Sequence, residues 1–125
     1  MLNFNSILVF SENQAKLSDF YAKVLAKKPD WTEDNWSGWK LGSGFISVGS
    51  HDKVSGKNKN PERIIINLET DDVSGEFDRI KKLGVEVVKE PYRPDEAHVD
   101  MWIATFADPD GNFFQLMTPW KGEMS

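Results

Sequence analysis

The spacing of apolar residues predicts a first helix over residues 11–28. Within this segment the apolar side chains recur every three or four positions, which places them on one face of a helix. Ser11 followed by Gln14 is typical of a capping box at the start of a helix, and Pro29 follows the segment and ends it. The apolar stripe consists of Leu17, Phe20, Tyr21, Val24 and Leu25.

The same spacing predicts a second helix over residues 71–84. Asp71 and Asp72 are both candidate N-caps, because a short carboxylate can accept a hydrogen bond from the free backbone N–H groups of the first turn. Gly84 occupies the position after the helix, where a left-handed backbone conformation is common. The apolar stripe consists of Val73, Phe77, Ile80 and Leu83.

The remaining apolar runs are short, rich in aromatic or β-branched residues and bounded by Gly, Pro or Asp, which predicts strands. Two of these runs, residues 4–10 and 63–69, lead directly into the two helices. The segments "LGSGF" and "ADPDGNF" have the composition of hairpin turns. The other predicted strands are residues 35–41, 44–50, 85–90, 101–107 and 112–118.

The order strand, helix and three strands is predicted twice, which indicates an internal repeat. A shift of 60 residues aligns Leu8 with Leu68 and Leu17 with Phe77, and a shift of 68 aligns residues 44–50 with the last strand. One such module is too small to bury a face of its sheet well, so we expect the two to pair. The expected organisation is a single domain of residues 1–125, with a first module at 3–50, a linker loop at 51–61 and a second module at 62–118.

The chain has 125 residues, carries a net charge of −5 and contains no cysteine. The absence of cysteine excludes disulfides, thiolate catalysis and Cys-ligated zinc, and it is typical of a cytoplasmic protein. The acidic balance argues against nucleic acid as a partner and suits a cationic ligand. The apolar runs are shorter than a membrane span, and the first ten residues are interpreted as a strand rather than a signal peptide. We therefore expect a cytoplasmic protein with no nucleic-acid partner and no membrane partner.

Five tryptophans and eight phenylalanines are many for a chain of this length. Aromatic side chains fill cores and sheet faces, and they also line small-molecule pockets, where they stack against flat ligands. Both interpretations remain open for the tryptophans. Trp102 lies in a predicted strand and is our first choice for a ligand contact. The others are Trp31, Trp36, Trp39 and Trp120.

The acidic segment "DPDGN" at residues 108–112 has three possible roles: a metal site, a turn or the wall of a pocket. An EF-hand loop needs oxygen ligands at alternate positions, Gly at position six and Glu at position twelve. Placing Gly111 at position six puts Phe106 at position one and Met117 at position twelve, so the pattern fails. We predict a tight hairpin turn in which Asp108 and Asn112 bond backbone amides.

The two histidines, His51 and His98, fall in predicted loops. Imidazole is a common metal ligand, so acidic neighbours could complete an unorthodox metal site around them. Their spacing matches no ligand motif, and solvent-exposed loop residues are the favoured interpretation. The acidic neighbours are Asp52, Asp95, Glu96 and Asp100.

Three segments in this order resemble the vicinal oxygen chelate superfamily, which includes glyoxalase I, bleomycin-resistance proteins and extradiol dioxygenases. They are "ILVFSENQAKLSDFYAKVL", "INLETDDVSGEFDRIKKLG" and "FADPDGNFFQL", and the resemblance covers essentially the whole chain. It implies an α+β fold in which paired βαβββ modules form a curled mixed sheet around a cavity. It also implies a homodimer, because members of the superfamily commonly dimerise.

Metal-dependent members of the superfamily place their ligands, typically His or Gln, Glu, His and Glu, on the cavity faces of the strands. In this chain the corresponding positions fall on Asn5, Ser47, Ile65 and Gln115. Isoleucine cannot donate to a metal, and hydroxyl and amide oxygens are weak, neutral donors for a catalytic divalent ion. The resemblance and these departures together imply a pocket that keeps the shape of the family's site without a metal or another cofactor.

Side-chain alternation along each strand assigns residues to the expected cavity. On the first strand, Ile7 and Val9 are expected to face the cavity, while Leu8 and Phe10 are expected to pack beneath the helix. Burying amides or a carboxylate without partners would cost about 1–3 kcal/mol for each group, which favours a wet or liganded cavity. The predicted pocket residues are Asn5, Ile7, Ser47, Ile65, Asn67, Glu69, Trp102, Phe113, Gln115 and Met117.

Two functions are consistent with such a pocket. The favoured hypothesis is a binding protein that holds a small, partly apolar or aromatic molecule without a metal. The alternative is an enzyme, either metal-dependent or based on Glu69, that acts as a lyase, isomerase or dioxygenase of the same superfamily. Glu69 is the one carboxylate on the assigned strand faces, and a carboxylate in an apolar pocket can serve as a general base. It lies at the rim of the expected pocket, where a solvated carboxylate is the favoured interpretation.

Overall fold

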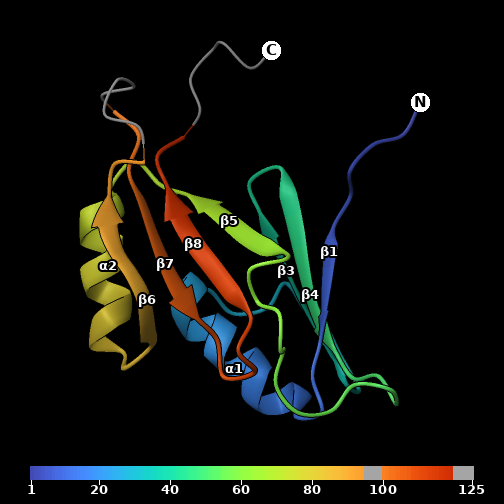
Figure 1. Ribbon diagram of the computed structural model, residues 1–125. Coiled ribbons are helices and arrows are strands. Elements are labelled where there is room, and N and C mark those ends of the chain that lie inside the picture. The colour runs from blue at the N-terminus through green and yellow to red at the C-terminus, as the bar shows by residue number, and fades with distance from the viewer. Residues whose placement is uncertain (95–99, 120–125) are drawn as a thin grey trace. The chain divides into compact units, whose positions relative to one another are not determined.

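The computed structural model describes residues 1–94 and 100–119, and the order β-α-β-β-β occurs in it twice (Figure 1). Contacts between Cα atoms divide the chain into two compact units, Met1–Lys57 and Asn58–Ser125. The first unit contains β1 (Ile7–Phe10), α1 (Gln14–Leu25), β2 (Trp31–Glu33), β3 (Trp36–Leu41) and β4 (Gly44–Gly49). The second contains β5 (Ile65–Glu69), α2 (Val73–Lys82), β6 (Glu86–Tyr92), β7 (Ile103–Ala107) and β8 (Phe113–Met117). In the described residues, no helix is long and apolar enough to cross a membrane.

Each unit is built on a mixed four-stranded sheet that does not close into a barrel. In the first unit the strand order is β1-β4-β3-β2, with β1 parallel to β4 and the other neighbours antiparallel. In the second unit the order is β5-β8-β7-β6, with β5 parallel to β8 and the other neighbours antiparallel. The two sheets therefore repeat one topology, which confirms the predicted α+β class and the two βαβββ modules.

Helix α1 begins later and ends earlier than the apolar spacing predicts. Its N-cap is Asn13, whose side chain accepts a hydrogen bond from the backbone N–H of Lys16 at 3.2 Å. The Ser11 hydroxyl instead accepts from the Asn13 N–H at 3.0 Å, so the predicted capping box is wrong. Ala26 adopts a left-handed conformation, with φ 53°, and ends the helix before Pro29.

The helix-covered face of the first sheet follows from the strand register. Val9 pairs with Val48 and Ile7 with Ile46, and Trp39 lies on the same face because it also pairs with Ile46. Trp39 and Val48 are fully buried, and Val9 is nearly so. Helix α1 packs against β4 and contributes its own buried apolar residues, Leu17, Tyr21 and Val24.

The faces predicted for β1 are inverted in the structure. Leu8 pairs with Ser47 on the face away from the helix and is 50% exposed, while Ile7 lies on the helix side.

The faces were predicted wrongly because the two modules are related by a shift of 59 residues rather than 60. Val9 corresponds to Leu68, because both pair with the equivalent position of the last strand of their own sheet. The N-caps Asn13 and Asp72 differ by the same 59 positions.

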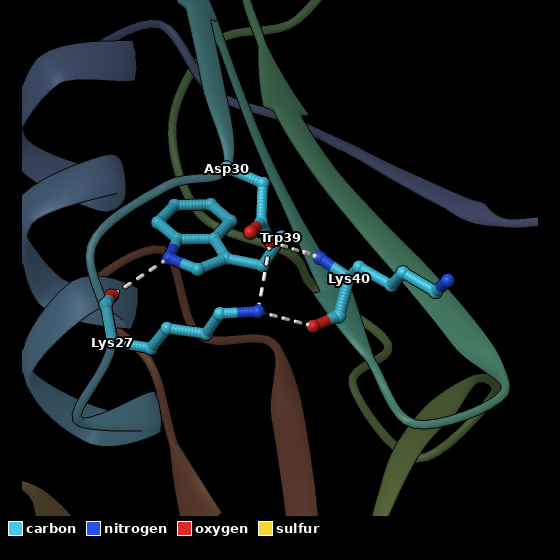
Figure 2. A network of polar contacts seen from close by, with 4 residues as sticks. All are labelled: Lys27, Asp30, Trp39 and Lys40. Carbon is cyan, nitrogen blue, oxygen red and sulfur yellow. Dashed lines mark hydrogen bonds and ion pairs between the residues drawn. The ribbon is translucent and has the colours of Figure 1, made fainter.

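A small polar network fixes the chain between α1 and β3 (Figure 2). The indole Nε1 of Trp39 donates to the carbonyl of Lys27 at 2.9 Å, which pairs the one polar atom of this buried side chain. The Asp30 carboxylate accepts from the backbone N–H of Lys40 at 2.6 Å and from the Lys27 ammonium at 2.9 Å. The same ammonium donates to the Lys40 carbonyl at 2.7 Å, so the segment that follows α1 is bonded to the end of β3.

This network makes the stability of the fold sensitive to acid. The Lys40 amide and then the Lys27 ammonium hold the pKa of Asp30 below its usual 3.8. A carboxyl whose pKa is depressed by folding adds stability above its unfolded pKa and loses it as the pH falls through the folded pKa. We therefore expect wild-type protein to lose free energy of unfolding below pH 3.8 more steeply than Asp30→Asn does. Urea denaturation at several pH values measures this.

Asp34→Asn is the matched control for that experiment, because Asp34 is an exposed carboxylate in the turn after β2. If Asp30→Asn and wild-type lose stability in parallel on acidification, the network does not stabilise the charged carboxylate and the explanation is wrong.

Helix α2 lies against β6, β7 and β8 of the second sheet, and Figure 1 shows it beside β6. Asp72 is the N-cap, and its carboxylate accepts from the Gly75 N–H at 2.9 Å, so the second of the two predicted caps is used. Gly84, with φ 87°, follows the C-cap as predicted. The core beneath the helix is a stack of three rings, Phe77, Phe106 and Phe114, with centroid distances of 5.2 and 5.4 Å.

The "DPDGN" segment forms the turn between β7 and β8. Asp108 is buried, and its carboxylate accepts from the backbone N–H groups of Asp110 at 2.9 Å and Asn112 at 3.0 Å. Gly111 supplies the left-handed conformation, with φ 82°. The Asn112 side chain donates to Asp108 rather than capping a backbone amide, and it accepts from the Asn58 amide at 3.0 Å. The hairpin and the role of Asp108 are confirmed, and the role predicted for Asn112 is corrected.

Candidate functional site

The face of the first sheet that α1 leaves uncovered forms an open pocket of about 480 Å³. Strands β1 to β4 all contribute to it, and the residues just before β1 complete one side. Its apolar lining consists of Leu8, Trp31, Trp36 and Phe45, and its polar lining of Asn5, Ser6, Glu33 and Ser47.

Trp31 lies flat on the floor of this pocket. It pairs with Gly38 across β2 and β3, and a Cβ at Gly38 would collide with the six-membered ring of the indole. Glycine therefore allows the ring to lie directly against the backbone of β3. The ring also contacts Phe45, with centroids 4.5 Å apart and planes inclined by 38°. Trp31 remains 39% exposed, so its outer surface is available to a ligand.

Trp36 repeats this arrangement on the next pair of strands. It pairs with Gly49 across β3 and β4, and a Cβ at Gly49 would lie 3.0 Å from its ring atoms. Phe10 packs edge-on against Trp36 with a centroid distance of 5.7 Å, and His51 packs in the same way against Phe10 at 5.3 Å. The pocket thus rests on two Trp–Gly cross-strand pairs, and aromatic contacts on both sides hold the rings.

The first of these pairs gives a direct test of the pocket floor. We expect Gly38→Ala to lower the free energy of unfolding by about 1–3 kcal/mol or to push the Trp31 ring out of place, because a methyl group cannot share that space. Urea denaturation and a crystal structure of the variant measure the two effects. Gly44→Ala is the matched control, since the nearest atom to its added Cβ lies 3.8 Å away. Equal behaviour of the two variants would show that the Trp31 ring does not rest on Gly38.

The polar groups of the pocket are few and mostly neutral. Ser47 is buried at the centre of the sheet, whereas Asn5 and Glu33 lie towards the solvent. Glu33 pairs with Trp36, so its side chain emerges on the pocket face beside that ring. Within residues 1–94 and 100–119, its carboxylate takes part in no ion pair. Lys40 shares the face but pairs with Phe45 near the far end of β3.

The predicted pocket residues of the first unit are placed in two ways. Asn5 and Ser47 line the pocket, whereas Ile7 lies on the helix-covered face and does not. Sequence reasoning missed four of the other lining residues, Ser6, Leu8, Glu33 and Phe45, and it left Trp31 and Trp36 open between the core and a ligand contact. The signal that identifies them is the register of two hairpins, which sets each tryptophan opposite a glycine.

In the second unit the register brings the predicted residues to the face of the sheet away from α2. The three pairs are Ile65 with Phe113, Asn67 with Gln115 and Glu69 with Met117. Gln115 also pairs with Thr105 of β7, whose hydroxyl donates to the Gln115 carbonyl at 3.3 Å. Whether this face binds a ligand stays a prediction.

Trp102 and Glu69 are exposed on this second unit. Trp102 immediately precedes β7, is 43% exposed and has the Arg93 guanidinium 6.0 Å from its ring centroid. Its backbone exchanges hydrogen bonds with Thr118, through the hydroxyl at 3.0 Å and the Thr118 N–H at 3.1 Å. Glu69 ends β5 and is solvated rather than enclosed in an apolar pocket.

The positions that carry metal ligands in the superfamily do not fit a divalent metal here. The shift of 59 residues makes Ser6, not Asn5, the counterpart of Ile65. The first unit then offers the hydroxyls of Ser6 and Ser47, and the second offers an isoleucine and the Gln115 amide. Neutral oxygens and one hydrocarbon side chain form a poor donor set for a catalytic divalent ion. In the described part of the chain, no three His, Asp or Glu side chains gather closely enough to hold a metal.

The alternative metal site around the histidines is placed only in part. His51 lies in the loop after β4, where its Nδ1 is 3.2 Å from the Asp52 carboxylate and accepts from the Lys53 N–H at 3.1 Å. Asp100 is exposed in the turn before β7. The remaining predicted members, His98, Asp95 and Glu96, lie outside the described residues, as does Trp120.

Comparison with known proteins identifies the family and the fold. Residues 6–117 match the family model of the glyoxalase-like domain. A conserved domain protein of solved structure is 22% identical with a TM-score of 0.79, and the match covers 95% of this chain and 100% of that one. A glyoxalase/bleomycin resistance protein from Catenulispora Acidiphila DSM 44928 is 16% identical with a TM-score of 0.72, covering 94% and 100%. A glyoxalase/bleomycin resistance protein/dioxygenase family enzyme from Burkholderia phytofirmans PsJN is 18% identical with a TM-score of 0.70, covering 90% and 95%. At such identities the likeness shows the fold, and no curated protein matches the sequence significantly.

Proposed function

The chain belongs to the glyoxalase-like domain family of the vicinal oxygen chelate superfamily, and we propose that it binds a small, partly aromatic or apolar molecule without a metal. The membership confirms the resemblance that the three sequence segments predict. The observation that carries the proposal is the pair of Trp–Gly contacts that floor the pocket of the first unit.

The pocket has the size and lining of a small-molecule site. Its volume of about 480 Å³ falls within the usual range for such sites, about 300–1,000 Å³. The rings of Trp31 and Trp36 are held by the glycines beneath them and by Phe45 and Phe10 beside them. Side chains that are already ordered lose little conformational entropy when a ligand stacks on them, which favours binding.

Two measurements on one preparation test this proposal. Protein purified without chelator is expected to contain no stoichiometric Ni, Zn, Mn or Fe. A thermal-shift screen with small aromatic molecules is then expected to give hits that persist after EDTA treatment. A ligand present at 100 times its Kd adds about 2.7 kcal/mol to the folding free energy, which raises Tm by several degrees.

The hits should no longer stabilise Trp31→Ala, and they should still stabilise Gln115→Ala, whose side chain lies on the second sheet. The proposal is contradicted if the hits require a stoichiometric metal, or if they stabilise Trp31→Ala as much as they stabilise the wild-type protein.

The alternative is a lyase, isomerase or dioxygenase of the same superfamily that either depends on a metal or uses Glu69 as a base. The observation that bears on it is that Glu69, Asn67 and Gln115 share one face of the second sheet. Conversion of a screening hit to product, seen by mass spectrometry and lost in Glu69→Gln, would favour this function over simple binding.

We also propose that the protein is a cytoplasmic homodimer. Several large apolar side chains are exposed, among them Leu2 and Phe4 of the first unit and Ile64 of the second. These side chains offer apolar surface that a second copy of the chain can cover. Light scattering at several concentrations measures the mass, and a monomer at all of them would contradict the dimer.

A further inference from the structure

The pocket of the first unit carries a carboxylate among aromatic rings, and this combination indicates the charge of its ligand. We infer that the pocket takes a small organic cation, a protonated or quaternary amine attached to an apolar or aromatic body. This inference rests on the proposed function and adds the chemical class of the ligand.

The aromatic rings supply the first part of the argument. The face of an indole is negative, and a cation near it is attracted by the ring quadrupole, most strongly for tryptophan. Trp31 lies flat against Gly38, so one face is covered by backbone and the remaining exposed surface is directed away from the strand. Trp36 lies in the same way on Gly49. Two adjacent strands therefore present indole surface to one pocket, which is the arrangement that suits an alkylated ammonium group.

Glu33 supplies the second part. It lines the pocket beside Trp36, and among the described residues it has no ion-pair partner. A ligand cation resting on the indoles would therefore meet a full negative charge that is not already neutralised. The same carboxylate would repel an anionic ligand at short range.

The other polar groups of the pocket do not reverse this preference. Asn5, Ser6 and Ser47 are neutral and can bond a ligand of any charge. Lys40 is the basic residue on this face of β3, but it is not part of the pocket lining. It pairs with Phe45, four residues along the strand from Trp36. The charge that the ligand meets inside the pocket is that of Glu33.

The test compares three probes of similar size in isothermal titration of the EDTA-treated protein: benzyltrimethylammonium, benzyl alcohol and phenylacetate. We expect the cation to bind about tenfold more tightly than the neutral alcohol, and the anion to bind most weakly. Glu33→Gln keeps the side-chain shape and removes the charge, and it should weaken cation binding about three- to fivefold, because Glu33 is exposed. Circular dichroism verifies that each variant is folded.

Asp34→Asn is the matched control, because it removes one carboxylate from the adjoining turn without touching the pocket lining. It should leave the affinity for the cation unchanged. The inference is wrong if benzyl alcohol or phenylacetate binds as tightly as the cation. It is also wrong if Glu33→Gln and Asp34→Asn have the same effect, or if the cation does not bind. The proposed function survives each of these results as long as other small molecules still stabilise the protein through Trp31.

Discussion

Replacing Trp39 by alanine is expected to lower the free energy of unfolding by about 3–5 kcal/mol, the usual loss when a large buried aromatic is truncated. Trp39 is completely buried between α1 and the first sheet, and its Nε1 pairs the Lys27 carbonyl at 2.9 Å. The alanine variant leaves a cavity and an unpaired carbonyl together. A domain of this size is stable by about 5–15 kcal/mol, so the variant would be close to unfolding. Urea denaturation followed by circular dichroism measures the change.

Two further variants separate the causes of that loss. Trp39→Phe keeps most of the ring volume and removes the hydrogen bond, so it should lose less than Trp39→Ala. Trp31→Ala truncates an exposed tryptophan of the same unit, and it should destabilise the fold least of the three. A loss in Trp31→Ala as large as that in Trp39→Ala would show that the helix-covered face has been assigned to the wrong side of the sheet.

Trp31→Ala is expected to weaken the affinity for benzyltrimethylammonium at least about tenfold, or about 1.4 kcal/mol, a larger loss of affinity than the other single substitutions should cause. Truncation removes the indole surface above Gly38 and leaves Phe45 without its ring contact. The loss follows from the position of the ring at the floor of the pocket, where a ligand would bury it. Isothermal titration of the EDTA-treated variant measures the affinity.

Trp31→Phe keeps a smaller aromatic ring and should fall between wild-type and Trp31→Ala. Trp102→Ala removes a tryptophan of similar exposure from the second unit and should leave the affinity within about twofold, as substitutions outside the contact region usually do. If Trp102→Ala weakens binding and Trp31→Ala does not, the ligand lies on the second unit, beside the tryptophan that the sequence analysis preferred as a ligand contact.

The helices and hairpins were accessible from sequence because local chemistry determines them. An apolar face of regular spacing predicts α1 and α2. A single glycine, Gly84 or Gly111, predicts the end of α2 and the turn before β8. Strand β2 has none, since its three residues are all exposed and it forms by pairing with β3. Its existence depends on the neighbouring strand rather than on its own pattern.

The face of β1 could not be read from alternation because both faces of the strand are apolar. Leu8 and Phe10 on one side, and Ile7 and Val9 on the other, are equally suited to a core. The register of the repeat decides between them, and aligning Leu8 with Leu68 moved it by one residue. In a strand, an error of one residue exchanges the two faces. The alternation of β5 and β8 was easier to interpret because Asn67 and Gln115 mark the open side.

The pocket floor was missed for a different reason. Trp31 and Trp36, taken singly, suit the core and a ligand contact equally well, and the glycine that each faces on the next strand decides between the two roles. Glu33 lies on the pocket face for a similar reason, because it pairs with Trp36 across β2 and β3. A sequence contains these pairs once the hairpin turns are located, but side-chain type alone does not reveal them.

The most direct test of a metal-free ligand site on the first sheet is a nuclear magnetic resonance titration of the tryptophan indole N–H signals. Benzyltrimethylammonium is added to EDTA-treated protein. The signals of Trp31 and Trp36 are expected to shift together with rising ligand concentration. The Trp39 signal should stay in place, because that indole is buried on the opposite face and donates to Lys27. Signals of Trp31 and Trp36 that remain still, or that move only after a divalent metal is added, would contradict the account.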